Sequence, residues 1–221
     1  MRGRALRRHR SRPMKRLALT LVLAQLLALP LAAPALATAS SGARFTTLAG
    51  FELDSGVPLS EVVKKLGAAT LQESGESGGY RARVCYRSAD AIVSFLSDTL
   101  GGHYHELLGY AIARPAQADA SACGTARPPF VAQELAIGGL HLGMSRGEFS
   151  ALLGQEVEWN GDSARRHYAS RVALTPAQRE AARADRPGEP VPEAWDVTIS
   201  ILADFKGDAL ASFEVWKIST D

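Results

Sequence analysis

Apolar residues recur at helical spacing near residue 60. Four of them occupy positions i, i+3, i+4 and i+7, which is one face of a short helix: Leu59, Val62, Val63 and Leu66. Lys64 and Lys65 fall on the opposite, solvent-facing side, and Gly67 provides a stop. The pattern predicts a short helix that packs one face onto a core.

The same pattern returns later in the chain. Gly56-Val-Pro-Leu-Ser-Glu-Val-Val-Lys-Lys-Leu-Gly67 is followed by Gly143-Met-Ser-Arg-Gly-Glu-Phe-Ser-Ala-Leu-Leu-Gly154, with Gly, Glu, Leu and Gly at identical offsets. The period, 143 − 56 = 87 residues, is too long for a solenoid repeat and suits a duplicated small domain.

Each helix is followed by segments of strand-like alternation. In the first half, apolar and polar residues alternate over 80–87, and further strands are expected over 91–95 and 104–113, joined through a turn at Gly101-Gly102. In the second half, strands are expected over 167–172, 197–201 and 210–218. A short helix and an antiparallel meander, repeated in tandem, predict an α+β fold.

The organisation follows from these patterns and from composition. Residues 1–37 are expected to be a signal peptide, 38–47 a flexible leader, 48–114 the first module, 115–133 a Pro/Ala-rich linker and 134–221 the second module. An insertion over 174–194 is expected in the second module only. Its Thr175-Pro-Ala-Gln178 start predicts an extra helix over 176–184.

The amino-terminal segment predicts export. Arginines and Lys15-Arg16 precede an apolar run, and Ala35-Leu-Ala37 offers a small-x-small cleavage site, with either Met1 or Met14 as the start. The run is shorter than the roughly 20 residues of a membrane-spanning helix. We therefore expect a periplasmic or secreted protein, cleaved near Ala37, with no transmembrane segment in the mature chain.

Cleavage changes the charge of the chain. Eight of the 25 Lys and Arg residues and none of the 23 Asp and Glu residues precede Thr38, so the mature chain carries 17 − 23 = −6. This balance argues against a nucleic-acid partner. The two cysteines, Cys85 and Cys123, are expected to form a disulfide in an oxidising compartment.

The repeated motif resembles a known family. Gly143-Met-Ser-Arg-Gly-Glu-Phe with Leu153-Gly154 is similar to the helix opening of the SmpA/OmlA (BamE-like) envelope domains and of the tandem-domain β-lactamase-inhibitor protein. The resemblance implies a helix on an antiparallel sheet in an exported protein that binds other proteins. Pro58 stands at the motif serine of the first copy, and no residue of a binding site is carried over.

Two patterns also suggest chemistry. Gly143-Met-Ser145-Arg-Gly147 fits the G-x-S-x-G nucleophile elbow, but Ser145 and Glu148 equally form an S-x-x-E capping box, and the aligned Pro58 cannot be a nucleophile. His103 and His105 would share one strand face and could chelate a metal with a third ligand: Asp98, His141 or His167. Solvated histidines at a strand start are the alternative.

Basic and aromatic residues supply the candidate binding surface. Arg81, Arg83 and Arg87 form a stripe on the expected outer sheet face, with Arg165, Arg166 and Arg171 as a second stripe. Such stripes are either solvated edge protection or a surface for an acidic partner. Trp159 is the aromatic candidate for binding, whereas Trp216 is expected in the core.

We therefore predict a non-enzymatic, protein-binding module of the cell envelope with no cofactor, acting through its sheet faces and the 174–194 insertion. The alternatives are a periplasmic hydrolase using Ser145 or a His103/His105 metal site, and a small-ligand carrier between the modules. The sequence leaves open the partner, the oligomeric state and whether the two modules share one core.

Overall fold

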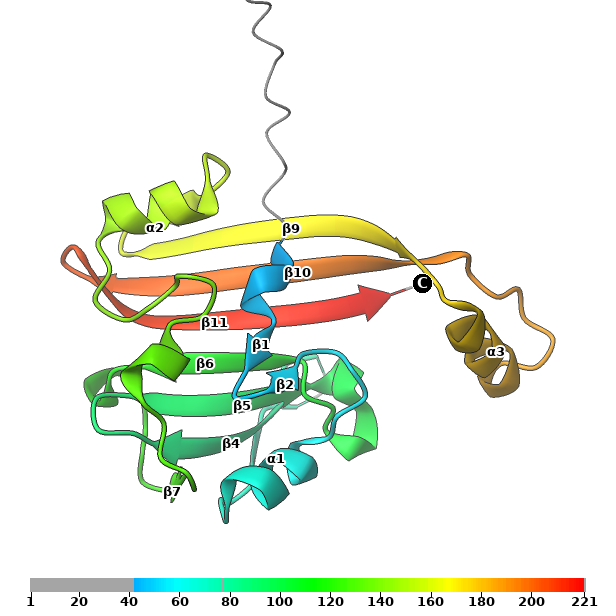
Figure 1. The fold of residues 1–221 in the computed structure, drawn as a ribbon, viewed down its shortest axis with the longest axis horizontal. Coiled ribbons are helices and arrows are strands. Elements are labelled where there is room, and N and C mark those ends of the chain that lie inside the picture. The colour runs from blue at the N-terminus through cyan, green and yellow to red at the C-terminus, as the bar shows by residue number, and fades with distance from the viewer. Residues whose placement is uncertain (1–41, 77, 221) are drawn as a thin grey trace, which may run out of the picture. The chain divides into compact units, whose positions relative to one another are not determined.

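Strands from both halves of the chain form one sheet in the computed structural model, which describes residues 42–76 and 78–220 (Figure 1). Its strands are β3 (Gln72–Ser74), β4 (Arg81–Arg87), β5 (Ile92–Asp98), β6 (Gly109–Ala113), β7 (Gly124–Thr125), β8 (Glu158–Asn160), β9 (Ser163–Ala173), β10 (Ala194–Lys206) and β11 (Ala209–Thr220). The strand order is β3-β4-β5-β6-β11-β10-β9-β8. Every pair is antiparallel except β7, which pairs in parallel with β4.

The remaining described elements are short. The α-helices are α1 (Leu59–Leu66), α2 (Arg146–Leu153) and α3 (Pro176–Asp185), and a small hairpin is formed by β1 (Thr47–Leu48) and β2 (Phe51–Glu52). Four 3-10 helices span Gly42–Phe45, Thr99–Tyr104, Pro115–Gln117 and Ala132–Leu135. The predicted α+β fold with two helix-and-meander copies is confirmed, and the helix predicted over 176–184 is observed as α3.

The two copies have equivalent helix ends. Gly56 and Gly143, which open the repeat, have φ of 77° and 86°, and the closing Gly67 and Gly154 have φ of 102° and 88°. A positive φ is strained for most residues with a Cβ, so glycine is favoured at all four positions. The periodic glycines of the sequence are therefore a backbone signature of the duplication.

The copies join through β6 and β11, so each meander runs outward from the centre of the sheet. Ser212 to Trp216 of β11 pair with Gly109 to Ala113 of β6 in antiparallel register. One core then serves both copies: Phe95 and Tyr110 from the first and Phe149, Phe205 and Phe213 from the second lie in the same buried cluster. This answers the question of a shared core that the sequence left open.

Helices α1 and α2 and the β1–β2 hairpin lie over the same face of the sheet (Figure 1). Phe51 of β2 meets the ring of Phe95 edge to face, and Phe149 of α2 meets Phe205 in the same way, with ring centroids 5.8 and 5.4 Å apart. Burying such side chains is the main stabilising term, at about 2 kcal/mol each. We call the opposite side of the sheet the bare face.

One predicted strand begins later than expected. The strand expected over 104–113 starts at Gly109, and Thr99–Tyr104 form a 3-10 helix instead. The Asp98 side chain accepts a hydrogen bond from the Leu100 N–H and so caps that helix, while Gly102 has φ 58° and His105 lies in the left-handed region. A paired glycine signals a turn, but its length cannot be judged from spacing alone.

Two other segments are held in place by packing. Phe45, within the expected leader, is fully buried, and the segment expected to be a linker carries β7 and the buried Phe130. The predicted disulfide between Cys85 and Cys123 is present and ties the same segment to β4. The predicted signal peptide, 1–37, lies outside the described residues.

Candidate functional site

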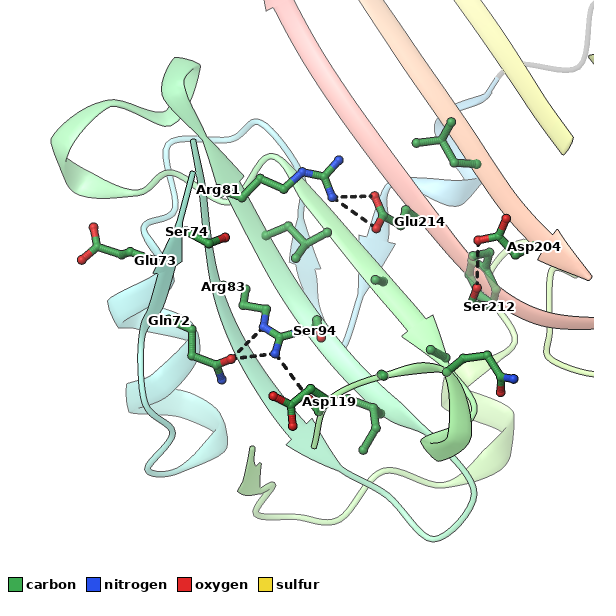
Figure 2. A pocket seen from close by; sticks show the side chains of 18 residues that line it. Gln72, Glu73, Ser74, Arg81, Arg83, Ser94, Asp119, Asp204, Ser212 and Glu214 are labelled. Atoms are coloured by element: carbon green, nitrogen blue, oxygen red, sulfur yellow. Dashed lines mark hydrogen bonds and ion pairs between the residues drawn. The ribbon is translucent and has the colours of Figure 1, made fainter. Parts of the chain in front are cut away.

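A groove lies on the bare face, at the centre of the sheet. Its volume is about 700 Å³, and Figure 2 shows it crossing β4, β5, β6 and β11. The floor is made of small side chains on three adjacent strands: Ser94, Ala111, Ala113 and Ser212. The side chains at the flanking positions are larger and extend further from the sheet. The groove therefore results from the difference in side-chain size.

Arg81 and Glu214 form one wall of the groove. The Arg81 guanidinium lies 3.4 Å from the Glu214 carboxylate and 5.2 Å from the centre of the Trp216 ring. Trp216 also donates its indole N–H to Glu214 over 2.9 Å. Gly109 faces Trp216 across the strands, and a Cβ there would lie 2.7 Å from the ring. The glycine therefore lets the indole lie flat against the sheet.

Arg83 forms the next part of that wall. Its guanidinium donates two hydrogen bonds to the Gln72 side-chain oxygen, at 2.9 and 2.6 Å, and one at 3.4 Å to the Asp119 carbonyl (Figure 2). The Asp119 carboxylate accepts the Ser121 N–H, which together with the Ser121 side chain lowers the pKa of that carboxyl. Arg83 is thereby fixed by two neutral acceptors, and its positive charge also helps to lower the pKa of the Asp119 carboxyl.

Asp204 lies across the floor from these arginines, on β10. Its carboxylate accepts hydrogen bonds from Ser163 at 2.6 Å and from Ser212 at 3.3 Å. Asp204 is exposed to solvent. Two hydroxyl groups therefore orient the carboxylate toward the groove without neutralising it.

The groove consequently presents a guanidinium, that of Arg83, and a carboxylate, that of Asp204, on opposite sides of its floor. Among the described residues, neither the Arg83 guanidinium nor the Asp204 carboxylate forms an ion pair within 4.0 Å. A charge held by neutral hydrogen-bonding groups keeps most of its field, whereas an ion pair cancels it at short range. The groove is therefore polarised, with a positive side at Arg83 and a negative side at Asp204.

The predicted basic stripe divides in the structure. Arg81, Arg83 and Arg87 do lie on one face of β4, but only Arg81 and Arg83 line the groove. Arg87 donates to the Ala120 carbonyl, with Nε 3.0 Å from that oxygen, and so holds the 117–125 segment in place. Part of the stripe therefore stabilises the chain itself.

Trp159 lies away from these arginines. Its ring packs against Phe149 and Phe205, with centroids 5.9 and 5.2 Å away, at the margin of the core on the helix-covered face. The Arg146 guanidinium covers the ring at 5.1 Å. The structure thus places Trp159 and the arginine stripe on opposite faces of the sheet.

The histidine pair is not on one strand, and this part of the hydrolase alternative is corrected. His103 lies on the 3-10 helix with its ring against Tyr104, while His105 stacks on Tyr80 at a centroid distance of 6.1 Å. A hydrogen bond to Glu73 raises the pKa of Tyr80 to about 12. In the part of the chain that the structure describes, no group of three His, Cys, Asp or Glu residues is placed to hold a metal.

Ser145 forms the capping box. Its side chain accepts the Glu148 N–H, while the Glu148 carboxylate accepts the Ser145 N–H over 2.7 Å. These bonds from Ser145 hold the pKa of Glu148 below its usual value. The Ser145 hydroxyl therefore makes its hydrogen bonds within the first turn of α2, as expected for a structural helix cap.

A second serine contacts a histidine on the bare face. His167 Nδ1 lies 2.8 Å from Ser200 Oγ, across the β9–β10 pair. Among the described residues no carboxylate contacts this imidazole, and β10 is paired on both sides, so the Ser200 backbone offers no spare N–H to an oxyanion. The arrangement is a cross-strand hydrogen bond without the groups that acyl transfer needs.

No described helix is long and apolar enough to cross a bilayer. No known protein family and no curated protein matches the chain. A solved structure from Streptococcus mutans, provisionally described as a beta-lactamase inhibitor protein, is similar over 75% of this chain and 83% of that one, at 10% identity and a TM-score of 0.22. At that score no feature of the site is transferred from it.

Proposed function

We propose that this chain is a non-enzymatic, protein-binding module of the cell envelope, whose partner docks on the bare face and inserts a side chain into the groove. The observation that carries the proposal is the polarised groove itself. Its small floor leaves room for a bulky side chain, and Arg83 and Asp204 present opposite charges to whatever covers it.

The expected partner surface has a complementary pattern. It presents an apolar or aromatic side chain to the floor at Ala111, an acidic group toward Arg83 and a basic group toward Asp204. Desolvated aromatic anchors in a pocket dominate protein interfaces, and charges of this kind fix orientation more than they add affinity. The disulfide supports an extracytoplasmic location, since such bonds persist in oxidising compartments.

Filling the groove tests the proposal. The Ala111→Trp variant places an indole on the half-buried floor without changing charge, and Ala151→Trp makes the same change on the exposed surface of α2. Each is used as bait in crosslinked capture from intact cells beside the wild-type chain. We expect the wild-type chain and the Ala151→Trp variant to capture the same envelope protein repeatedly, and the Ala111→Trp variant to lose it. The comparison requires that the two variants unfold at similar temperatures.

The insertion is tested separately. Ala173 and Ala194 face each other across β9 and β10, so a two-residue turn can replace residues 174–193 without moving either strand. If capture persists in this deletion and fails with Ala111→Trp, the groove is the binding surface. Capture that depends on the insertion alone, or equally strong capture by all variants, contradicts the proposal.

A further inference from the structure

The outer edge of β9 is unpaired along most of its length. β9 has eleven residues, and β8 pairs only with Ser163, Ala164 and Arg165. The edge from Arg166 to Ala173 has no strand partner among the described residues. Unpaired edges are the places where sheets recruit further strands.

The register shows which backbone groups point outward. Phe205 donates its N–H to the Asp162 carbonyl, so even-numbered residues of this strand bond to β10. Odd-numbered residues then direct N–H and C=O to the outer edge, as they do opposite β8. Along the open part these are His167, Ala169, Arg171 and Ala173.

The arginines on the open part of this edge are Arg166 and Arg171, and Arg171 pairs with Asp196 on the neighbouring strand β10. The Arg166 guanidinium donates to the outward His167 carbonyl over 2.7 Å, which blocks that one group. Beyond it, residues 169–173 are all exposed, including Val172 at 50%. An exposed β-branched residue on a long edge strand favours pairing, because natural edges are normally kept short or charged.

We infer that β9 pairs with β9 of a second copy of this chain, antiparallel about a two-fold axis at Ser170. In this register Ala169 lies opposite Arg171 of the partner subunit, and Tyr168 lies opposite Val172 of the partner subunit. Ser170 lies opposite Ser170 of the partner subunit. Aromatic–β-branched pairs and Ser–Ser pairs are favourable cross-strand neighbours.

The neighbouring symmetric registers are worse. An axis at Ala169 would pair Arg171 of the partner subunit with His167, whose outward carbonyl already accepts from Arg166. An axis at Arg171 would set two arginines directly opposite each other. Like charges directly opposite destabilise a strand pair. The closed, isologous contact at Ser170 avoids both and limits assembly to a dimer.

An engineered thiol tests this register. The chain has no free cysteine, so Ser170→Cys introduces a single reactive thiol. At a non-hydrogen-bonded pair the Cα atoms lie about 4.5 Å apart, within reach of a disulfide. Under a mild oxidant at micromolar protein we expect dimer crosslinking on the order of 100-fold faster than for Thr198→Cys, because pairing raises the local thiol concentration to millimolar or above.

The control residue and two further variants keep the test decisive. Thr198 is also exposed but lies one strand inward, on β10. Ala169→Pro removes an outward N–H and fixes φ at that residue, which edge strands tolerate, and Val172→Lys changes only a side chain. Each variant should turn a concentration-dependent dimer in sedimentation velocity into a monomer. The thermal unfolding midpoint should stay close to that of wild type. A wild-type chain that stays monomeric to millimolar concentration, or equal crosslinking of the two cysteine variants, overturns the inference.

Discussion

The outermost long strands of the two copies, β4 and β9, differ in how much of their outer edge is paired with another strand. β4 has β3 along one part of its outer edge and β7 along the other, and the Cys85–Cys123 disulfide fixes that second segment. β9 has only the short β8. The duplicated modules therefore diverged at the sheet edges, where one copy became closed and the other remained open.

Their helix starts diverged as well. Ser145 caps α2 with its side chain, whereas the equivalent Pro58 makes no side-chain cap at α1. Yet both residues form a β-bridge near the start of a central strand. Pro58 pairs with Glu106, which precedes β6, and Ser145 pairs with Ala209, the first residue of β11. The backbone frame of the repeat is retained while the local chemistry varies.

Removing the disulfide should have the largest effect, because it opens the closed edge. For the double variant Cys85→Ala/Cys123→Ala we expect the free energy of unfolding to fall by about 3–4 kcal/mol, since a loop of 38 residues is released in the unfolded chain. Urea titration measures this. A loss below about 1 kcal/mol would mean that β7 and the Arg87 contact hold the segment without the bond.

Replacing the helix cap should have a smaller effect. Ser145→Ala removes the side-chain acceptor for the Glu148 N–H, and we expect a loss of about 1 kcal/mol in the free energy of unfolding with the fold intact. The same urea titration measures it. A hydrolase that depended on this hydroxyl would instead lose all turnover at nearly unchanged stability.

The first copy allows the converse experiment. Pro58 has an extended backbone and Glu61 lies three residues on, so serine at position 58 can form the capping box that α1 lacks. We expect Pro58→Ser to be about 1 kcal/mol more stable than Pro58→Ala, which shares the loss of the proline ring. Equal stabilities would show that α1 and α2 do not begin in equivalent ways.

The smallest expected effect is a pH dependence at α2. Because the pKa of Glu148 is lowered in the fold, its contribution is present above the unfolded value of about 4.5 and is lost as pH falls through the lower folded pKa. Unfolding measured from neutral to strongly acid pH should therefore show Glu148→Gln less stable than wild type at neutral pH and equal to it in acid. A gap that stays constant with pH would contradict the assignment.

The repeated sequence was sufficient to predict the fold class because the periodic glycines and apolar stripes directly encode local backbone geometry. Leu59 to Leu66 and Pro176 onward became helices as expected. The pairing of β6 with β11 was not predictable, since nothing local in either strand specifies a partner about 100 residues away. The turn at 99–105 was misjudged because the Asp98 cap outweighs strand propensity there.

The groove was visible in the sequence only in part. The alternation of the sequence marks Arg81 and Arg83, but Asp204, Ser212 and Glu214 are isolated polar residues in strands and belong to no motif. Their significance arises from register, which sets Ser212 opposite both Ala113 and Asp204. Small residues at Ser94, Ala111 and Ala113 were the available signal, because a strand face of small side chains predicts a depression.

Site-specific photo-crosslinking in living cells would test the central claim, that the bare face is the binding surface, most directly. A photoreactive amino acid is placed at Ala111 or Asp204 on the groove and, as controls, at Lys64 of α1 or Ala151 of α2, which are exposed over the covered face. We predict one discrete crosslinked protein from both groove positions and none from the helix positions. Crosslinks to the same protein from the helices, with none from the groove, would contradict this account.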